Sequence, residues 1–192
     1  MADESKKSAE SYVTMHSDIP RPEWKPPQKQ PTPYSDEVEV PDPSTKSMGA
    51  NYKLMISAVV PRPIAFVSSR SESGSVNLAP FSYFNVMGHD PPVVSFSVCE
   101  SQGQHKDTLK NIKESGECVV SIIAEWFIEN ANHTCGNWPY EMDEFEISGL
   151  TKGESQKVKA PYVKESPFNM ECKVIKCVLR YEPYFYHGCV ER

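Results

Sequence analysis

The segment PRPIAFVSS, from Pro61 to Ser69, is followed after a short turn by NLAPFSYFN, from Asn77 to Asn85. The first segment is an apolar run that ends in two hydroxyl side chains, a pattern typical of a buried strand. The second segment mixes small polar residues with aromatic rings and contains no acid, base or metal ligand. Short hydrogen-bond donors beside flat apolar rings suit a planar, anionic cofactor, so the two segments predict a cofactor site next to a strand.

Several other short segments are also predicted to be strands. The turn from Ser71 to Gly74 separates two of them and makes a hairpin-like arrangement. In another, Val94, Phe96 and Val98 alternate with serines, as in a strand with one polar face. The predicted strands are 64–69, 76–79, 93–99, 118–123 and 168–179. Short strands without a regular βαβ alternation favour a mainly β (α+β) fold, an antiparallel barrel with helical insertions.

The clearest helix pattern covers residues 107–116. Asp107 is suited to cap the N-terminus, Leu109 and Ile112 share one face, and Gly116 is a natural C-terminal stop. Further helical segments are expected at 126–134 and 143–147, and residues 52–58 read as a short helix or an entry segment.

The residues His105-Lys106-Asp107-Thr108 precede and begin this predicted helix. Free backbone N–H groups, the positive end of the helix dipole, a hydroxyl and a lysine side chain together make a phosphate-binding arrangement. This segment alone is weak evidence, because a lysine before a helix start is common. Together with the two segments above, it predicts that a phosphate group of the cofactor lies at the start of the helix.

These three segments, in this order, resemble the flavin reductase-like family, and the resemblance extends from about residue 51 to about residue 180. It implies an FMN-binding split β-barrel that usually forms a homodimer. It also implies that Ser68 and Ser69 approach the polar edge or the ribityl chain of the flavin, and that Lys106, Asp107 and Thr108 flank the phosphate. The cofactor-binding residues that follow from it are Ser68, Ser69, Asn77, Ala79, Pro80, Ser82, Tyr83, Lys106, Asp107 and Thr108, and Arg62 is added from its own setting in the chain.

Some of these residues have a second interpretation. Arg62 lies between two prolines that stiffen the backbone, so its guanidinium either contacts the cofactor or pairs with a carboxylate that orients the strand. The aromatic side chains of Phe81, Tyr83 and Phe84 either contact the flavin or pack in the core or a dimer interface. His89 precedes Asp90-Pro91-Pro92 and is expected to be a solvated loop residue.

The chain has no G-x-G-x-x-G motif, so NAD(P)H is expected to bind over the flavin itself. The first hypothesis is therefore an FMN-dependent oxidoreductase that uses NAD(P)H to reduce flavin or a related acceptor. The second is an FMN-binding protein or complex subunit without independent turnover. The third is a shortened, non-catalytic form with an interaction role. The catalytic residues are left unknown, because hydride transfer between stacked rings needs little from side chains.

The net charge is −6 and the pI is near 5.4, which gives no electrostatic reason to expect nucleic acid or an acidic membrane surface as a partner. No apolar run is long enough to span a membrane, and the first residues do not resemble a leader peptide. A cytoplasmic protein is expected, with access to the nucleus left open. The six cysteines form no metal-ligand pattern and are expected to be reduced thiols, with Cys135 and Cys189 as the only redox candidates.

Residues 1–48 are expected to form a disordered or loosely packed Pro-rich arm, because repeated prolines deny the segment helix and strand hydrogen bonds. The domain is expected to cover residues 49–192. Members of the family normally continue beyond the position of Arg192, and here the chain stops as a strand begins. The domain is therefore expected to lack its C-terminal portion, which would leave an unpaired strand edge.

Overall fold

The structure is a computed structural model that describes residues 23, 25–29, 40–99, 105–178 and 187–191. It divides into two units, Met1–Pro41 and Asp42–Arg192, and all the elements described below belong to the second. The arm predicted for residues 1–48 lies largely outside the described residues. The boundary between the two units comes a few residues before the predicted one.

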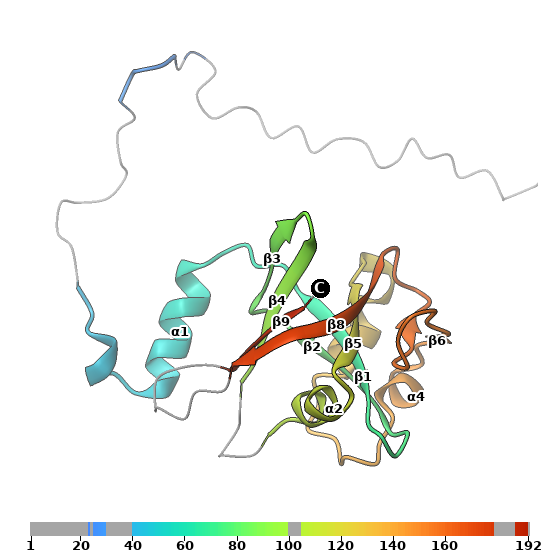
Figure 1. Ribbon diagram of the computed structural model, residues 1–192. Coiled ribbons are helices and arrows are strands. Elements are labelled where there is room, and N and C mark those ends of the chain that lie inside the picture. Colours follow the sequence, from blue (N-terminus) through green and yellow to red (C-terminus); the bar gives the residue numbers. More distant parts are fainter. Residues whose placement is uncertain (1–22, 24, 30–39, 100–104, 179–186, 192) are drawn as a thin grey trace, which may run out of the picture. The chain divides into compact units, whose positions relative to one another are not determined.

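A seven-stranded antiparallel sheet with the strand order β2-β1-β5-β8-β9-β4-β3 forms the body of the domain (Figure 1). The long strand β8 connects its two halves, because residues 169–173 pair with β5 and residues 174–178 pair with β9. The strands are β1 (Ala65–Arg70), β2 (Val76–Phe81), β3 (Phe84–His89), β4 (Pro92–Val98), β5 (Glu117–Ile122), β8 (Asn169–Val178) and β9 (His187–Glu191).

The two halves of the sheet enclose one apolar core. Its centre is made of alternate residues of the strands, such as Val67, Phe96 and Val120, each at most 1% exposed. Leu109 and Ile112 of α2 (Asp107–Ser115) complete it from one side, so the helix face predicted from their spacing is the buried face. The domain therefore fixes α2 firmly beside β1 and β2.

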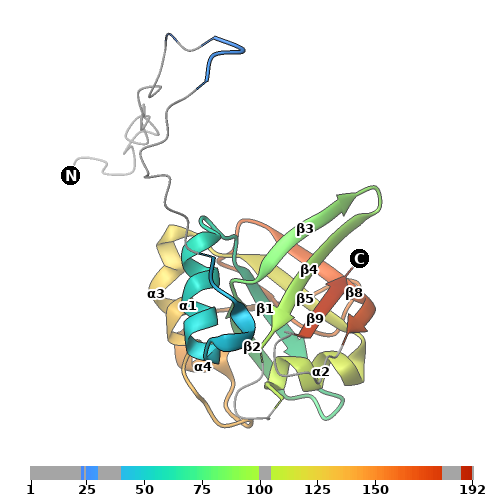
Figure 2. The ribbon, with the colours of Figure 1, turned by 90° about the vertical axis from the view of Figure 1, so that its left-hand side faces the viewer.

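The opposite face of β1 and β2 is covered by short helices (Figure 2). Phe66 and Leu78 point to this side and pack with Phe127, Phe145 and Val163. The covering elements are η3 (Glu125–Phe127), α3 (Ile128–His133), α4 (Glu144–Ser148) and the two-stranded sheet of β6 (Lys152–Gly153) and β7 (Tyr162–Val163). The strand β2 therefore has α2 on one side and these short helices on the other.

The elements before β1 bury no side chain. They are η2 (Pro43–Thr45) and α1 (Met48–Ala58), whose N-terminus is capped by the hydroxyl of Ser47 at 3.2 Å from the Ala50 nitrogen. Arg62 donates hydrogen bonds to the carbonyls of Ile56 and Val59, groups that the end of a helix leaves without intrahelical partners. The stiff Pro61-Arg62-Pro63 segment therefore holds the C-terminal end of α1.

Most of the predicted elements are present at the expected places, with differences in detail. The strands β3, β6 and β7 were not predicted; β3 begins at Phe84, inside the aromatic segment, and pairs with β4. The residue at the N-cap of α2 is Lys106, not Asp107, and Asp107 lies in the first turn, 3.1 Å from Lys110. Gly116 ends α2 in the left-handed conformation, with φ of 68°, as its position predicted.

Candidate functional site

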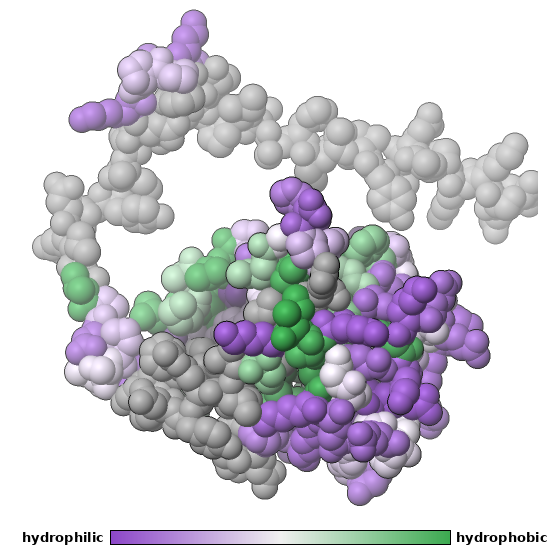
Figure 3. Space-filling model, viewed as in Figure 1, coloured by the Kyte–Doolittle hydropathy of each residue, from purple (hydrophilic) through white to green (hydrophobic). Residues whose placement is uncertain are grey.

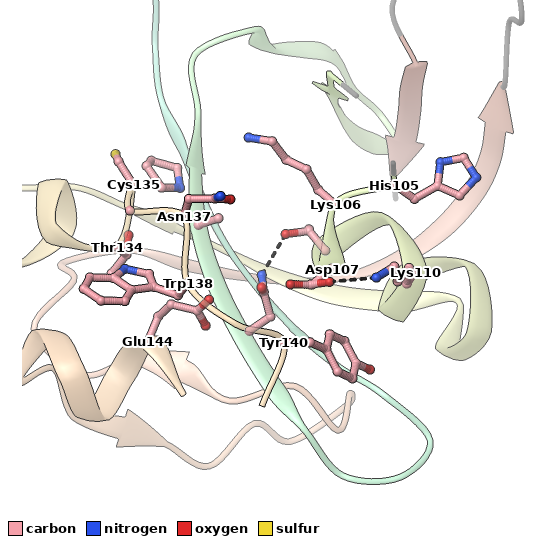
Figure 4. A pocket seen from close by; sticks show the side chains of 15 residues that line it. His105, Lys106, Asp107, Lys110, Thr134, Cys135, Asn137, Trp138, Tyr140 and Glu144 are labelled. Atoms are coloured by element: carbon pink, nitrogen blue, oxygen red, sulfur yellow. Dashed lines mark hydrogen bonds and ion pairs between the residues drawn. The ribbon is translucent and has the colours of Figure 1, made fainter. Parts of the chain in front are cut away.

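A pocket of about 690 Å³ lies where β2, the start of α2 and the loop between α3 and α4 meet (Figure 4). This size is within the usual range for sites of small molecules and cofactors. Its wall is largely polar and carries charges of both signs. The lining residues are Asn77, Ala79 and Pro80 of β2, His105 to Thr108 and Lys110 at the start of α2, Thr134 to Trp138 and Tyr140 of the loop, and Glu144 of α4.

A buried hydrogen bond joins β2 to α2 at the pocket wall. The side-chain amide of Asn77 donates to the hydroxyl of Thr108 over 2.8 Å, and the two residues are 8% and 1% exposed. A hydroxyl that accepts one hydrogen bond still has its own proton to donate. The bond thus fixes the first turn of α2 against the strand and leaves a donor on Thr108.

The N-terminus of α2 opens toward the pocket without a side-chain cap. The first backbone bonds of the helix run from the Leu109 and Lys110 N–H groups to the Lys106 carbonyl, so the N–H groups of Asp107 and Thr108 come before the helical ladder. Lys106 extends into the open part of the pocket, with its Nζ 5.8 Å from the centre of the Phe81 ring (Figure 4). This end of the pocket is positive and rich in donors.

The loop between α3 and α4 folds tightly around Trp138. The indole N–H donates to the His133 carbonyl over 3.3 Å, and the two rings lie 5.2 Å apart. A Cβ atom on Gly136 would come within 2.5 Å of the indole nitrogen, so only glycine fits there with the indole in this position. Gly136 therefore allows the loop to place Trp138 in the pocket wall.

The far end of this loop is held on α2. The Tyr140 hydroxyl donates to the Asn111 side-chain oxygen over 3.3 Å, and Lys110 lies 5.2 Å from the centre of the Tyr140 ring. Asn111 is fully buried and donates in turn to the hydroxyl of Ser69 on β1 over 3.2 Å. A chain of hydrogen bonds thus links the pocket loop, α2 and β1.

Glu144 is the most deeply buried charged residue of the pocket, at 7% exposed. Its Oε2 accepts the backbone N–H of Leu78 over 3.0 Å, which connects α4 to the part of β2 between Asn77 and Ala79. Burial raises the pKa of Glu144 above its ordinary value, and the nearby carboxylates of Asp143 and Asp107 raise it further. No ion pair in the described part of the chain includes Glu144.

The predicted cofactor-binding residues fall into two groups. Those at the pocket wall are Asn77, Ala79, Pro80, Lys106, Asp107 and Thr108. The others lie outside the wall: Ser68 donates to the Pro161 carbonyl, Ser69 accepts from Asn111, Arg62 holds the end of α1, and Ser82 and Tyr83 lie in the bend between β2 and β3. A direct role of each residue in cofactor binding remains a prediction.

The α3–α4 loop and Glu144 were not predicted as site residues. The sequence gives little indication of their role in a site. Gly136, Asn137 and Pro139 indicate only a loop, and Glu144 has the pattern of an ordinary acid in the first turn of a helix. Among the described residues, no cluster of potential metal ligands is found and no helix has the length and apolar character to cross a membrane.

The family model for the flavin reductase like domain matches residues 56–182. The chain belongs to the flavin reductase-like family. Within the family, nitrilotriacetate monooxygenase component B from Bacillus cereus is 35% identical in its crystal structure, with a TM-score of 0.78 and coverage of 82% of this chain and 80% of that one. A structure described as a flavin reductase with split barrel domain from Shewanella frigidimarina, at 18% identity, shares the fold with a TM-score of 0.66 over 77% of this chain and 72% of that one. The fold is therefore a split barrel.

Three curated relatives are described only as uncharacterized proteins. A protein of Aquifex aeolicus is 43% identical over 138 residues, which cover 71% of this chain and 70% of the relative. The matched part is 64% and 60% of the length of two further relatives, from Halalkalibacterium halodurans and Bacillus subtilis. Membership of the family supports flavin binding and a flavin-related oxidoreductase.

Proposed function

We propose that this protein binds FMN in the pocket beside β2 and uses NAD(P)H to reduce flavin or a related acceptor. The observation that carries the proposal is the uncapped N-terminus of α2, which opens into the pocket next to Lys106 and the Thr108 hydroxyl. Anions bind at such helix starts because the free N–H groups and the helix dipole both favour negative charge.

The donors of the pocket fit a flavin phosphate ester. The backbone N–H groups of Asp107 and Thr108, the hydroxyl of Thr108 and the ammonium of Lys106 are donors on one wall. Asp107 is the one nearby acid in this first turn, and its carboxylate is paired with Lys110. The local charge is therefore favourable for a phosphate dianion.

The remainder of the pocket suits the ring system. Ala79 and Pro80 offer a flat apolar edge of β2, and Trp138 and Tyr140 add aromatic surface from the loop. A bound flavin would supply the hydride-accepting chemistry, and the protein residues would orient it and limit the access of water. Backbone and side-chain donors near the pocket would favour the negative charge that reduction adds.

We also propose that the protein forms a homodimer through the apolar surface of α1 and β3. Apolar side chains gather over the end of α1 (Figure 3), and none of the helix is buried in the single chain. Tyr52, Met55, Val59, Val86 and Met87 are each 47–62% exposed. Exposed apolar side chains of this kind are typical of protein contacts. A second copy is the partner that the family suggests.

A cytoplasmic location is part of the same proposal. The thiols of Cys99, Cys135 and Cys172 are free, and Cys135 is exposed. Free thiols fit a reducing compartment.

The phosphate assignment is tested with Lys106→Ala and two ligands. Losing one charged donor should weaken FMN about 10- to 100-fold, and riboflavin, which lacks the phosphate, should change less than about twofold. Lys113→Ala is the matched control, because this lysine lies in the last turn of the same helix and outside the pocket wall. Equal losses for FMN and riboflavin would contradict the assignment.

Turnover separates the enzyme from a flavin carrier. The FMN-loaded protein should lose its visible flavin absorbance when NADH or NADPH is added without oxygen, and should consume the nicotinamide continuously when free flavin and oxygen are present. Stable flavin absorbance with both nucleotides would favour an FMN-binding subunit without independent turnover.

A further inference from the structure

We propose that Glu144 is a proton acceptor linked to flavin reduction, so that its carboxylate takes up one proton when two electrons enter the pocket. This inference rests on the proposed function, because it requires a flavin in that pocket. It assigns to Glu144 a role that neither hydride transfer nor phosphate binding calls for.

Glu144 is held at the wall of the pocket. The side chain belongs to the first residue of α4, lines the pocket, and is more than nine-tenths buried. One carboxylate oxygen receives the N–H of Leu78, so the group is held against the same strand residues, Asn77 and Ala79, that line the pocket. Figure 4 shows the carboxylate beside Trp138 and directed toward the pocket. A ligand that fills this space would displace the remaining water from it.

Several charged groups surround Glu144. Asp143 precedes Glu144 and contacts Lys152, and Asp107 across the pocket pairs with Lys110. The other titratable groups of the pocket wall are His105, Lys106, Cys135 and Tyr140. None of the ion pairs in the described part of the chain gives one of these cations to Glu144, and the groups that favour its charged form are two backbone N–H groups, that of Leu78 and its own. Burial and the two neighbouring acids already favour the protonated form and raise its pKa.

A new negative charge in the pocket would shift this balance further. A hydride from the nicotinamide, or two electrons and one proton from a chemical reductant, leaves the reduced flavin with one additional negative charge. Two like charges in one buried site are costly, and the cost falls when one of them is neutralised. The Glu144 carboxylate would then bind a proton from the bulk solvent and become a carboxylic acid. The complete change is two electrons and two protons, of which one proton arrives with the hydride or from the chemical reduction and the other is bound by Glu144.

The linkage predicts a specific dependence of the midpoint potential on pH. For a two-electron couple, each proton taken up changes the potential by about 30 mV per pH unit. The pKa of Glu144 should be higher with reduced flavin than with oxidised flavin. In the pH window between these two pKa values, the midpoint potential of the wild type should fall about 30 mV per pH unit more steeply than that of Glu144→Gln. Above this window, Glu144→Gln should have the higher potential, because it lacks the repelling charge.

The experiment is a redox titration of the FMN-loaded proteins from about pH 5 to about pH 9, a range that includes the values known for buried glutamates. Glu144→Gln keeps an acceptor for the Leu78 N–H. Glu146→Gln is the control, since this acid lies on the same helix with a side chain 79% exposed and outside the pocket wall. It should retain the wild-type slope.

A second readout observes the proton directly. The infrared difference spectrum between reduced and oxidised wild-type protein should contain a carboxylic acid C=O band that disappears in Glu144→Gln and shifts in Glu144→Asp. Identical slopes for wild type and Glu144→Gln, or a band that persists in Glu144→Gln, would overturn the proposal. Failure of wild-type protein to bind FMN would instead overturn the proposed function and this inference with it.

Discussion

The side-chain amide of Asn77 on β2 donates a hydrogen bond of 2.8 Å to the hydroxyl of Thr108 in the first turn of α2. Both residues are almost completely buried and both line the pocket. This hydrogen bond thus joins β2 to the start of α2, two segments whose bonded residues are 31 positions apart in the sequence. The position of the helix start, and with it the proposed phosphate site, depends on this contact.

Replacement of Thr108 by valine should destabilise the domain by about 1–3 kcal/mol, because the shape is kept while the buried Asn77 amide loses its acceptor. Urea unfolding of the apo protein measures the change. Thr151→Val, at an exposed position, should change the free energy of unfolding by less than about 0.5 kcal/mol. An unchanged stability for Thr108→Val would show that the bond contributes little.

Gly136→Ala should displace Trp138 and weaken flavin binding. The added methyl group would lie 2.5 Å from the indole nitrogen, so the indole must leave its position beside His133. The near-UV circular dichroism of the tryptophans and the dissociation constant for FMN should both change. Gly49→Ala is the matched control, because nothing lies within 4 Å of a Cβ at that position. Wild-type values of both quantities in Gly136→Ala would refute this role for the loop.

Glu144 should make the folded protein less stable at higher pH. Its pKa is raised in the folded state, so its contribution is complete below the unfolded value near 4.5 and is lost as the pH rises through the folded value. Relative to Glu144→Gln, the wild-type free energy of unfolding should therefore decrease over that interval. Parallel pH profiles for the two proteins, measured by denaturant unfolding, would contradict the assignment.

Glu171 should have the opposite pH dependence. Its carboxylate accepts the backbone N–H groups of Gln156, Lys157 and Val158, and the bond from Gln156 is the main reason that its pKa is lowered. The contribution of this contact is present above about 4.5 and is lost as the pH falls through the lower folded value.

The NMR signals of these amides report the Glu171 contact. They should titrate below pH 4.5 in the wild type and should not titrate in Glu171→Gln. Glu154→Gln, an exposed acid of the same loop, should behave as the wild type. Amide signals that titrate identically in Glu171→Gln would rule out the contact as their cause.

The strands and α2 were predictable because their signals are local. The alternation of Val94, Phe96 and Val98 with serines corresponds to alternate burial along β4, and Gly116 occupies the left-handed position that ends α2. By contrast, β3 has no such alternation. It is an edge strand in which Val86 and Met87, two consecutive apolar residues, are 61% and 62% exposed.

The site was predictable only in part, because part of its wall is assembled by tertiary contacts. Asn77 and Lys106 belong to segments with recognisable patterns, and both line the pocket. Trp138 and Glu144 reach it through the packing of α3 and α4 on β2, which no spacing in the sequence encodes. For Arg62, the flanking prolines indicated a stiff backbone, but the sequence did not reveal its hydrogen-bond partners, which are two carbonyls at the end of α1.

The most direct test of the central claim is the visible absorbance spectrum of the purified protein after FMN has been added and the excess removed by gel filtration. The proposed site predicts that a flavin spectrum remains with the protein, and that much less remains with Lys106→Ala. Complete loss of flavin from the wild-type protein would contradict the account, because the pocket beside β2 would then not be an FMN site in this chain.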